Sequence, residues 1–199
     1  MQQSESLQAN LVRAGFAALR QIGGEPLVHI ILAEAGESEL ADRASGQERI
    51  PIERYLRYRD AALNFLQESF SSTAFETGKI LVRELKDERP QQLSWLLDQY
   101  KHAANKLPLI GQAAVLAARD NPGAVSAKMK SRDVLLITIE RCPECRGLRR
   151  SAPFCYLNQG IISEFAASFL SLHVATHETR CMALGDERCE IEVTVEGAA

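Results

Sequence analysis

The sequence predicts an α+β fold in which a mainly helical part, residues 1–120, precedes an α+β part, residues 121–199. In the first part apolar residues recur at three- and four-residue spacing, which is the period of amphipathic helices. In the second part short runs rich in β-branched residues lie between turn residues, a pattern typical of strands. A long helical pattern between these runs has two apolar faces, so we expect this helix to be buried. At 199 residues the two parts most simply form one domain.

Glycine and proline residues divide the helical part. Gly23-Gly24 ends the first helix, and Pro26 opens a second that closes near Gly36. The polar residues 37–49 indicate a short helix or a loop. Four further helices are predicted, with Ser71-Ser72-Thr73 as a break and N-cap between the first two: Pro51 to Phe70, Phe75 to Leu85, Leu93 to Tyr100 and Leu109 to Ala118.

The period of the pattern changes after a turn at Asp120 to Gly123. The run Val134 to Glu140 is rich in β-branched residues and predicts a strand, and Gly185-Asp186 predicts the turn of a β-hairpin. The other elements expected here are a strand from Ala124 to Lys130, the buried helix from Tyr156 to Leu172, and the hairpin arms Val174 to Met182 and Arg188 to Val195.

The composition is ordinary for a globular protein, with 46% apolar and 25% charged residues. The net charge of -3 argues against a nucleic-acid-binding protein, because such proteins carry a basic footprint. The N-terminal segment MQQSESLQ is polar, so we expect no secretory signal. The apolar runs are far shorter than the roughly 20 residues of a membrane span. These observations predict a cytoplasmic protein without a transmembrane segment.

All five cysteines lie between Cys142 and Cys189. In a reducing compartment such a cluster indicates metal or redox chemistry more than disulfides. Cys155, Glu178, Cys181 and Cys189 supply three thiols and one carboxylate, a complete set of four ligands. Zinc prefers four ligands rich in thiolate, and a site with four protein ligands is structural because no position is left for water. One prediction is therefore a structural zinc bound by these four residues.

This ligand set places a requirement on the local backbone. Glu178 and Cys181 are three residues apart, so a regular strand would point them to opposite faces. Both can bind one ion only if the strand has a bulge or bend near Thr179. Arg180 and Arg188 flank the ligands in sequence, and we expect them to offset the negative charge of the site.

Two other interpretations of the cysteines stay open from the residues alone. Cys142 and Cys145 form a C-x-x-C pair that could join Cys181 and Cys189 in a different zinc site. Alternatively, the thiols are free and pack in the core as small hydrophobic side chains.

Three segments resemble the 4-vinyl reductase domain family of small-molecule-binding modules. They are ECRG from Glu144, the helical segment APFCYLNQGIISEFAASFL around Cys155, and E-x-x-C-x-x-x-G-D-x-x-C-x-I-x-V from Glu178 to Val193. The sequence is most similar to stand-alone members that act in bacteriochlorophyll synthesis, and it differs from them at residues 118–129. The resemblance implies the α+β fold that this family shares with haem/nitric-oxide sensors and vesicle-tethering subunits.

The resemblance also implies a ligand set and a function. It implies that Cys155, Glu178, Cys181 and Cys189 bind zinc, and that the other two cysteines are loop residues. It further implies an accessory protein that binds a hydrophobic tetrapyrrole, such as a chlorophyll precursor, and delivers it to a partner enzyme of tetrapyrrole synthesis. The long helix and the strand Val134 to Glu140 are the expected pocket walls. The expected lining residues are Leu136, Phe165, Phe169 and Trp95.

Other functions fit the same sequence. A stand-alone sensor of aromatic ligands, or a scaffold that forms a homodimer, would need no catalytic residues. A true vinyl reductase is disfavoured, because a reductase needs a hydride or electron source. The sequence contains no G-x-G-x-x-G motif, no phosphate-binding glycine loop and no second set of cysteines for an iron–sulfur cluster.

Overall fold

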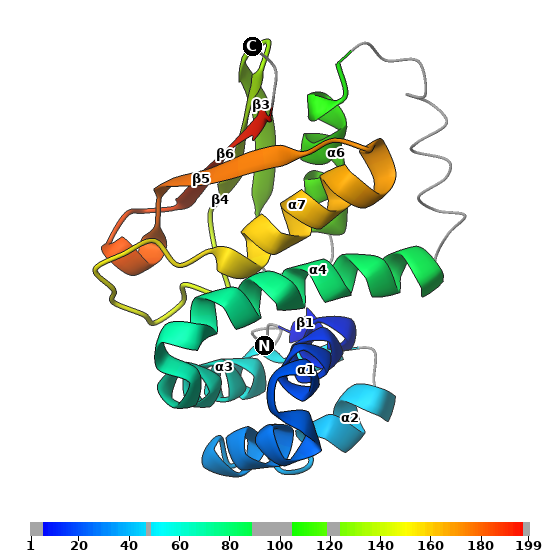
Figure 1. The fold of residues 1–199 in the computed structure, drawn as a ribbon. Helices are drawn as coiled ribbons and strands as arrows, with labels where there is room; N and C mark the ends of the chain where they lie inside the picture. Colours follow the sequence, from blue (N-terminus) through cyan, green and yellow to red (C-terminus); the bar gives the residue numbers. More distant parts are fainter. Residues whose placement is uncertain (1–5, 47–48, 89–104, 119–123, 197–199) are drawn as a thin grey trace, which may run out of the picture.

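The computed structural model describes residues 6–46, 49–88, 105–118 and 124–196. Helices α1 to α3 form one end of the molecule, and a four-stranded sheet with α6 and α7 forms the other (Figure 1). Helix α4 lies between these two ends. The predicted helix Leu93 to Tyr100 and the predicted pocket residue Trp95 lie outside the described residues.

The helical part begins with a short strand. The elements in order are β1 (Ser6–Gln8), α1 (Ala9–Glu34), α2 (Leu40–Gly46), β2 (Arg49–Pro51), α3 (Ile52–Leu66), the 3-10 turn η1 (Gln67–Ser69) and α4 (Phe70–Glu88). The predicted division of the first helical segment is present as a kink, because Gly24 has non-helical backbone angles with φ of 69°. The predicted break at Ser71 is wrong, because the chain turns earlier, at Gln67 with φ of 47°.

Helix α6 (Leu107–Ala117) is the last element of the first part and packs with the sheet of the second. The elements of the second part are β3 (Val125–Ser131), β4 (Val134–Ile139), α7 (Tyr156–Leu170), β5 (Val174–Arg180), the 3-10 turn η2 (Met182–Leu184) and β6 (Cys189–Val195). The strands pair antiparallel in the order β3-β4-β6-β5. The α+β fold predicted from the sequence is therefore confirmed, and the four predicted strands are present within a few residues of their expected bounds.

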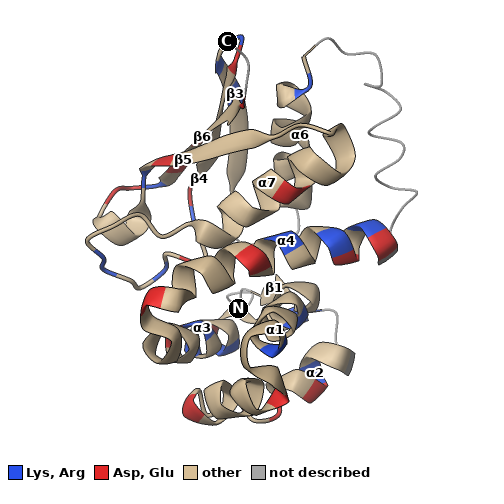
Figure 2. Ribbon diagram, in the orientation of Figure 1, with Lys and Arg blue, Asp and Glu red and all other residues tan. Residues whose placement is uncertain are grey.

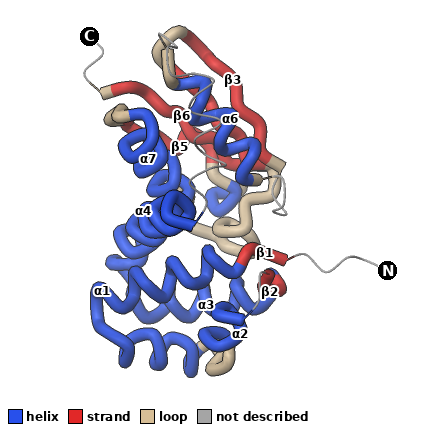
Figure 3. Tube along the Cα trace, turned by 90° about the vertical axis from the view of Figure 1, so that its right-hand side faces the viewer, coloured by secondary structure: helices blue, strands red, loops and turns tan. Residues whose placement is uncertain are grey.

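The two faces of the sheet differ in what covers them. Leu135, Ile137 and Ile139 project from β4 to the buried face, where α6 packs against β3 and β4. Leu136 alternates with them and so projects to the opposite face, where it lies between Lys128 of β3 and Glu192 of β6. Figure 3 shows α6 next to the sheet, and helices α1 to α3 below α4.

The two parts meet where α4 crosses α7. Gly78 of α4 and Gly160 of α7 lie at the crossing, and a Cβ atom at either would overlap a backbone carbonyl oxygen of the other helix. The helices therefore approach to backbone contact, which only glycine permits. Arg83 of α4 and the mostly buried Glu164 of α7 form an ion pair at the same interface.

This crossing gives a prediction for stability. We expect Gly160→Ala to lower the free energy of unfolding by about 1–3 kcal/mol, because the added methyl overlaps the Phe75 carbonyl and the helices must separate. Urea denaturation measures the difference. Ser163→Ala on the same helix is the control and should change stability by less than about 0.5 kcal/mol. Equal stability of Gly160→Ala and the control would show that the helices do not touch there.

Charged residues are distributed over both parts of the molecule. Figure 2 shows basic and acidic positions interleaved along α4 rather than gathered by sign. Among the described residues, no helix combines the length and the apolar character that crossing a bilayer requires.

Candidate metal centre and adjoining cavity

The hairpin between β5 and β6 places two sulfurs side by side. Cys181 follows β5 and Cys189 begins β6. The turn between them is closed by Gly185, at φ of 107°, and by Asp186, whose carboxylate accepts a hydrogen bond of 2.8 Å from the Cys181 N–H. The Met182 N–H lies 3.3 Å from the Cys189 sulfur and donates to it. Such a turn with an N–H···S bond holds both sulfurs toward the interior.

The predicted irregularity of the strand is present. Glu178 pairs with Ile191 and Arg180 pairs with Glu190, so Thr179 is an extra residue in β5. The bulge turns Glu178 and Cys181 toward the same interior, and both side chains are buried. The prediction of a bulge near Thr179 is therefore confirmed.

Glu178 connects the hairpin to the long helix. Cys155 is the N-cap of α7, and its N–H donates a 2.9 Å hydrogen bond to Glu178 Oε2. The positive end of the helix dipole therefore meets both the carboxylate and the Cys155 sulfur. Glu178 Oε1 is buried and makes no hydrogen bond within the described structure. A buried carboxylate oxygen without a partner is costly, and a metal ion would satisfy it.

A third segment, the loop Cys142 to Gly147 after β4, completes the site. Arg59 of α3 holds this loop, because its Nη1 lies 3.0, 2.8 and 2.9 Å from the carbonyl oxygens of Pro143, Glu144 and Arg146. The guanidinium group is only 4% exposed, and its other nitrogens donate to Asp60. The sequence prediction did not include Arg59. Its position on the buried face of α3, beside Tyr55 and Ala62, was a signal that could have identified it.

The five sulfurs form one buried cluster. The Cys145 sulfur lies 3.5 Å from those of Cys155 and Cys181 and 3.6 Å from that of Cys189. The Cys142 sulfur lies 3.5 Å from that of Cys155. A tetrahedral ion with bonds of about 2.3 Å to sulfur separates its sulfurs by about 3.8 Å, so the observed spacing suits a metal–thiolate site.

Two overlapping groups of donors can hold a metal ion. In each group the donor atoms lie within 4.8 Å of one another, and every residue is buried. The first group is Cys145, Cys155, Glu178, Cys181 and Cys189, and the second is Cys142, Glu144 and Cys155. The resemblance placed Cys142 and Cys145 outside the ligand set, whereas the structure brings both of their sulfurs against it. The first group contains all four residues of the first predicted zinc site, whereas neither group joins Cys142 to Cys181 and Cys189, as the alternative site would require.

The thiols affect one another's acidity within the cluster. The neighbouring Cys142 thiol is the largest cause of the raised pKa of Cys155 and of the lowered pKa of Cys189. Burial raises the pKa of Glu144 to about 8, although Asn158 and the Leu157 N–H donate hydrogen bonds to its carboxylate. Both donors belong to the first turn of α7, so Glu144 caps this helix beside the cluster.

The two arginines that flank the hairpin ligands do not face the cluster. Arg180 and Arg188 are about half exposed, and both guanidinium groups pair with Glu190 on the outer surface. The expectation that they offset the charge of the site is therefore wrong. Their positions on β5 and beside β6 point them to solvent, and the buried cation next to the loop is Arg59.

A cavity of about 180 Å³ adjoins the cluster, between the helical part and the sheet. Its lining is mostly apolar, with Glu144, Asn158 and Tyr55 among its polar residues. The apolar lining comes from several elements and is represented by Leu11, Leu81, Ala114, Val125, Ile137, Ile139 and Ile161.

The predicted pocket walls are partly those of this cavity. Strand β4 lines it through Ile137 and Ile139 and not through Leu136, which is on the other face of the strand. Helix α7 lines it with its first turns, whereas Phe165 and Phe169 lie further along the helix, where their tilted rings pack together with centroids 5.1 Å apart. These two phenylalanines are not among the residues that line the two cavities described here.

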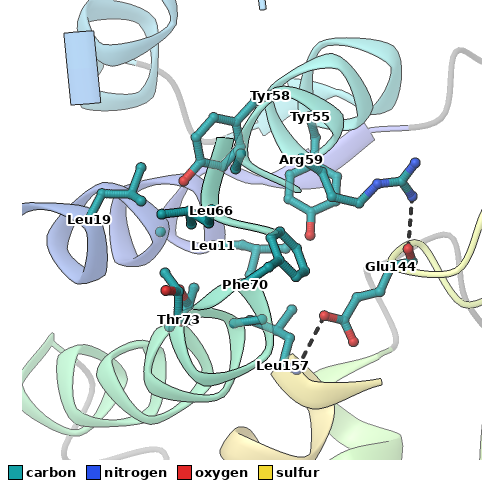
Figure 4. Close-up of a pocket in the computed structure, with 14 residues that line it drawn as sticks. Leu11, Leu19, Tyr55, Tyr58, Arg59, Leu66, Phe70, Thr73, Glu144 and Leu157 are labelled. Atoms are coloured by element: carbon teal, nitrogen blue, oxygen red, sulfur yellow. Dashed lines mark hydrogen bonds between the residues drawn. The ribbon is translucent and has the colours of Figure 1, made fainter. Parts of the chain in front are cut away.

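A smaller cavity of about 40 Å³ lies between α1, α3, α4 and the start of α7 (Figure 4). Figure 4 shows Arg59 reaching the Glu144 carbonyl oxygen, and the Glu144 carboxylate meeting the backbone of Leu157. Tyr55 and Glu144 line both cavities. Glu144 therefore belongs to the metal-ligand cluster and also lines both cavities.

The match to a known family lies in the second part of the chain. Residues 135–195 match the 4-vinyl reductase domain family, which confirms the resemblance to that family for these residues. An uncharacterized protein from Methanocaldococcus jannaschii is 35% identical over 68 residues, which are 34% of this chain and 38% of that protein. The chain thus matches well under half the length of this curated relative.

The fold of the whole described chain is similar to that of H-NOX proteins. The unliganded Fe(II) form of an H-NOX variant from K. algicida matches with a TM-score of 0.64 and 8% identity, over 96% of this chain and 98% of that one. The Fe(II)NO form of an H-NOX protein from S. oneidensis also matches with a TM-score of 0.64 and 8% identity, over 96% of this chain and 100% of that one. An H-NOX variant from T. Tengcongensis matches with a TM-score of 0.63 and 13% identity, over 96% of this chain and 98% of that one. At these identities the similarity concerns the fold alone.

Proposed function

We propose that the protein binds a hydrophobic small molecule in the 180 Å³ cavity, and that a structural zinc ion holds one end of that cavity in place. The main support for this proposal is the position of the cavity, which lies between the two parts of the fold and ends at the metal-ligand cluster. Ligand sites commonly occur at such junctions and combine an apolar lining with a few polar groups.

Zinc is the proposed metal because the donors are mainly thiolates. Soft thiolate ligands select zinc and exclude magnesium and calcium. The proposed ligands are those the resemblance implies, Cys155, Glu178, Cys181 and Cys189. They join the start of α7 to the β5–β6 hairpin, so an ion bound to them would fix the helix that lines the cavity. Four protein ligands leave no open position, so the ion is structural.

Two kinds of hydrophobic ligand compete for the cavity. The resemblance favours a chlorophyll-type tetrapyrrole, bound as an accessory factor and passed to a partner enzyme. The volume favours a single aromatic ring, because a cavity of about 150 Å³ accommodates benzene. A tetrapyrrole would fit only if α4 and α6 moved apart. The aromatic ligand is therefore the candidate that the geometry supports, and the tetrapyrrole is the candidate that the resemblance supports.

The polar residues of the cavity indicate how such a ligand would be oriented. Burial raises the pKa of Tyr55 well above its usual range, so its hydroxyl stays protonated near neutral pH and can donate a hydrogen bond. A ring that carries one hydroxyl or carbonyl oxygen would accept that bond at the inner end of the cavity.

Titrations of the zinc-loaded protein test the proposal and separate the two ligands. We expect saturable binding when a phenol is added, observed by calorimetry, and the same experiment with a porphyrin tests the tetrapyrrole. Binding of the porphyrin alone would favour the accessory role. The proposal fails if neither compound binds to protein that contains its metal.

A cavity-filling variant locates the binding. In Ala114→Trp the new side chain occupies the cavity from α6, so ligand affinity should fall by about tenfold or more, since steric overlap typically costs about 1–3 kcal/mol. Gln112→Trp carries the same substitution at an exposed position of the same helix and should bind like the wild type. Equal loss of affinity in both variants would place the ligand elsewhere.

A further inference from the structure

The metal-ligand cluster contains more donors than one ion can use. The two overlapping groups together comprise the five cysteines, Glu144 and Glu178, all buried. A tetrahedral zinc takes four of them. If those four are Cys155, Glu178, Cys181 and Cys189, then Cys142, Cys145 and Glu144 remain without a role in the proposed site.

The remaining donors are arranged around the same sulfur. The donor atoms of Cys142, Glu144 and Cys155 all lie within 4.8 Å of one another, and the Cys142 and Cys155 sulfurs are 3.5 Å apart. Cys155 thus belongs to both donor groups. A thiolate has several lone pairs and can bond two metal ions at once, so one sulfur can connect two metal sites.

We propose that the protein binds a second divalent thiophilic ion, held by Cys142, Glu144 and Cys155, with the Cys155 sulfur shared between the two ions. This inference rests on the first ion of the proposed function and extends it from one metal to a thiolate-bridged pair. The Cys145 sulfur also lies 3.5 Å from that of Cys155.

The surroundings of the second group suit a bound cation. Both oxygens of Glu144 already accept hydrogen bonds, from the Leu157 N–H at 3.2 Å and from Asn158 at 2.8 Å, and each keeps a further lone pair. The Asn158 amide also points toward the Cys142 sulfur, at 3.8 Å. These contacts fix the orientation of two of the three ligands, as supporting hydrogen bonds do in protein metal sites.

The loop that carries these ligands is also held in place by contacts of its own backbone with α3. Arg59 fixes the carbonyl groups on both sides of Glu144, and Pro143 restricts the backbone between Cys142 and Glu144. A loop that served only to connect β4 with α7 would not need a buried guanidinium group. The same restraint is what a preformed metal site requires.

Metal counting tests the pair directly. The full-length protein, purified with zinc and freed of loosely bound metal by gel filtration, should contain two zinc ions per chain by elemental analysis. One ion per chain would overturn the second site and leave the first intact. No bound metal would overturn both, whatever the outcome of the ligand titrations.

Conservative variants assign the second ion to its ligands. Cys142→Ser and Glu144→Gln should each reduce the content from two ions to one, whereas Glu187→Gln, an exposed carboxylate in the hairpin turn, should keep two. Retention of two ions in both Cys142→Ser and Glu144→Gln would overturn the assignment.

Wild-type protein loaded with an NMR-active cadmium isotope tests the shared sulfur without any variant. Two cadmium resonances that are coupled to each other are expected, and two uncoupled resonances would overturn the shared sulfur.

Discussion

Cys189→Ser should lose the metal ion of the hairpin site and with it a large part of the stability of the fold. Cys189 begins β6 in the centre of the sheet, is fully buried, and its sulfur is 3.6 Å from that of Cys145. The serine oxygen is a weaker ligand for a thiophilic ion and, without the ion, leaves a buried hydroxyl among thiols. Loss of a structural metal belongs to the few single changes that cost about 4 kcal/mol or more.

Thermal denaturation and metal analysis measure this effect. A loss of that size lowers the Tm of a chain of this length by roughly 10 °C or more. Wild-type protein treated with a strong chelator should melt at a similarly lowered temperature, because its site is then empty as well. Glu187→Gln in the same hairpin should melt like the wild type. A Cys189→Ser protein that retains its metal and its Tm would show that Cys189 is not a ligand.

The hairpin could be predicted from the sequence because its determinants are local. Gly185-Asp186 marks the turn, and the spacing of Glu178 and Cys181 requires the bulge that the structure contains at Thr179. Likewise, Cys155 was expected at the start of the long helix and is its N-cap. Each of these features depends on residues within about ten positions along the chain, where periodicity and turn chemistry apply.

Features that depend on distant residues could not be predicted in the same way. Arg59 contacts carbonyl groups 84 to 87 positions later in the sequence, and no local pattern relates the two segments. Leu136 lies in a strand that is apolar on both faces, so its hydrophobicity did not show which face meets the cavity. The residues alone left open whether Cys142 and Cys145 meet the other thiols, because their position depends on the same loop.

Arg59→Met is the second change with a large expected effect. Methionine keeps an unbranched apolar side chain in place of the arginine stem but is shorter and donates no hydrogen bond, so the variant removes the hydrogen bonds and retains part of the packing. The carbonyl groups of Pro143, Glu144 and Arg146 would lose their contact with a buried cation. Losing the partners of buried polar groups costs about 1–3 kcal/mol for each group, so the free energy of unfolding should fall by about 3 kcal/mol or more.

The same variant separates a stabilising arginine from one that also prepares the metal site. If Arg59 only joined α3 to the loop, stability would fall and the affinity for zinc would stay unchanged in the folded protein. Because the loop carries Cys142 and Glu144, the proposed ligands of the second ion, we expect the affinity for that ion to fall as well, by about 10- to 100-fold, as when supporting contacts of metal ligands are removed. Competition with a chromophoric chelator, in buffer without denaturant, measures this affinity. Arg43→Met, at an exposed position of α2, is the matched control and should change neither quantity. If the Arg59→Met protein is less stable but binds zinc as tightly as the wild type, then Arg59 contributes only to the contact between α3 and the loop and does not support the metal site.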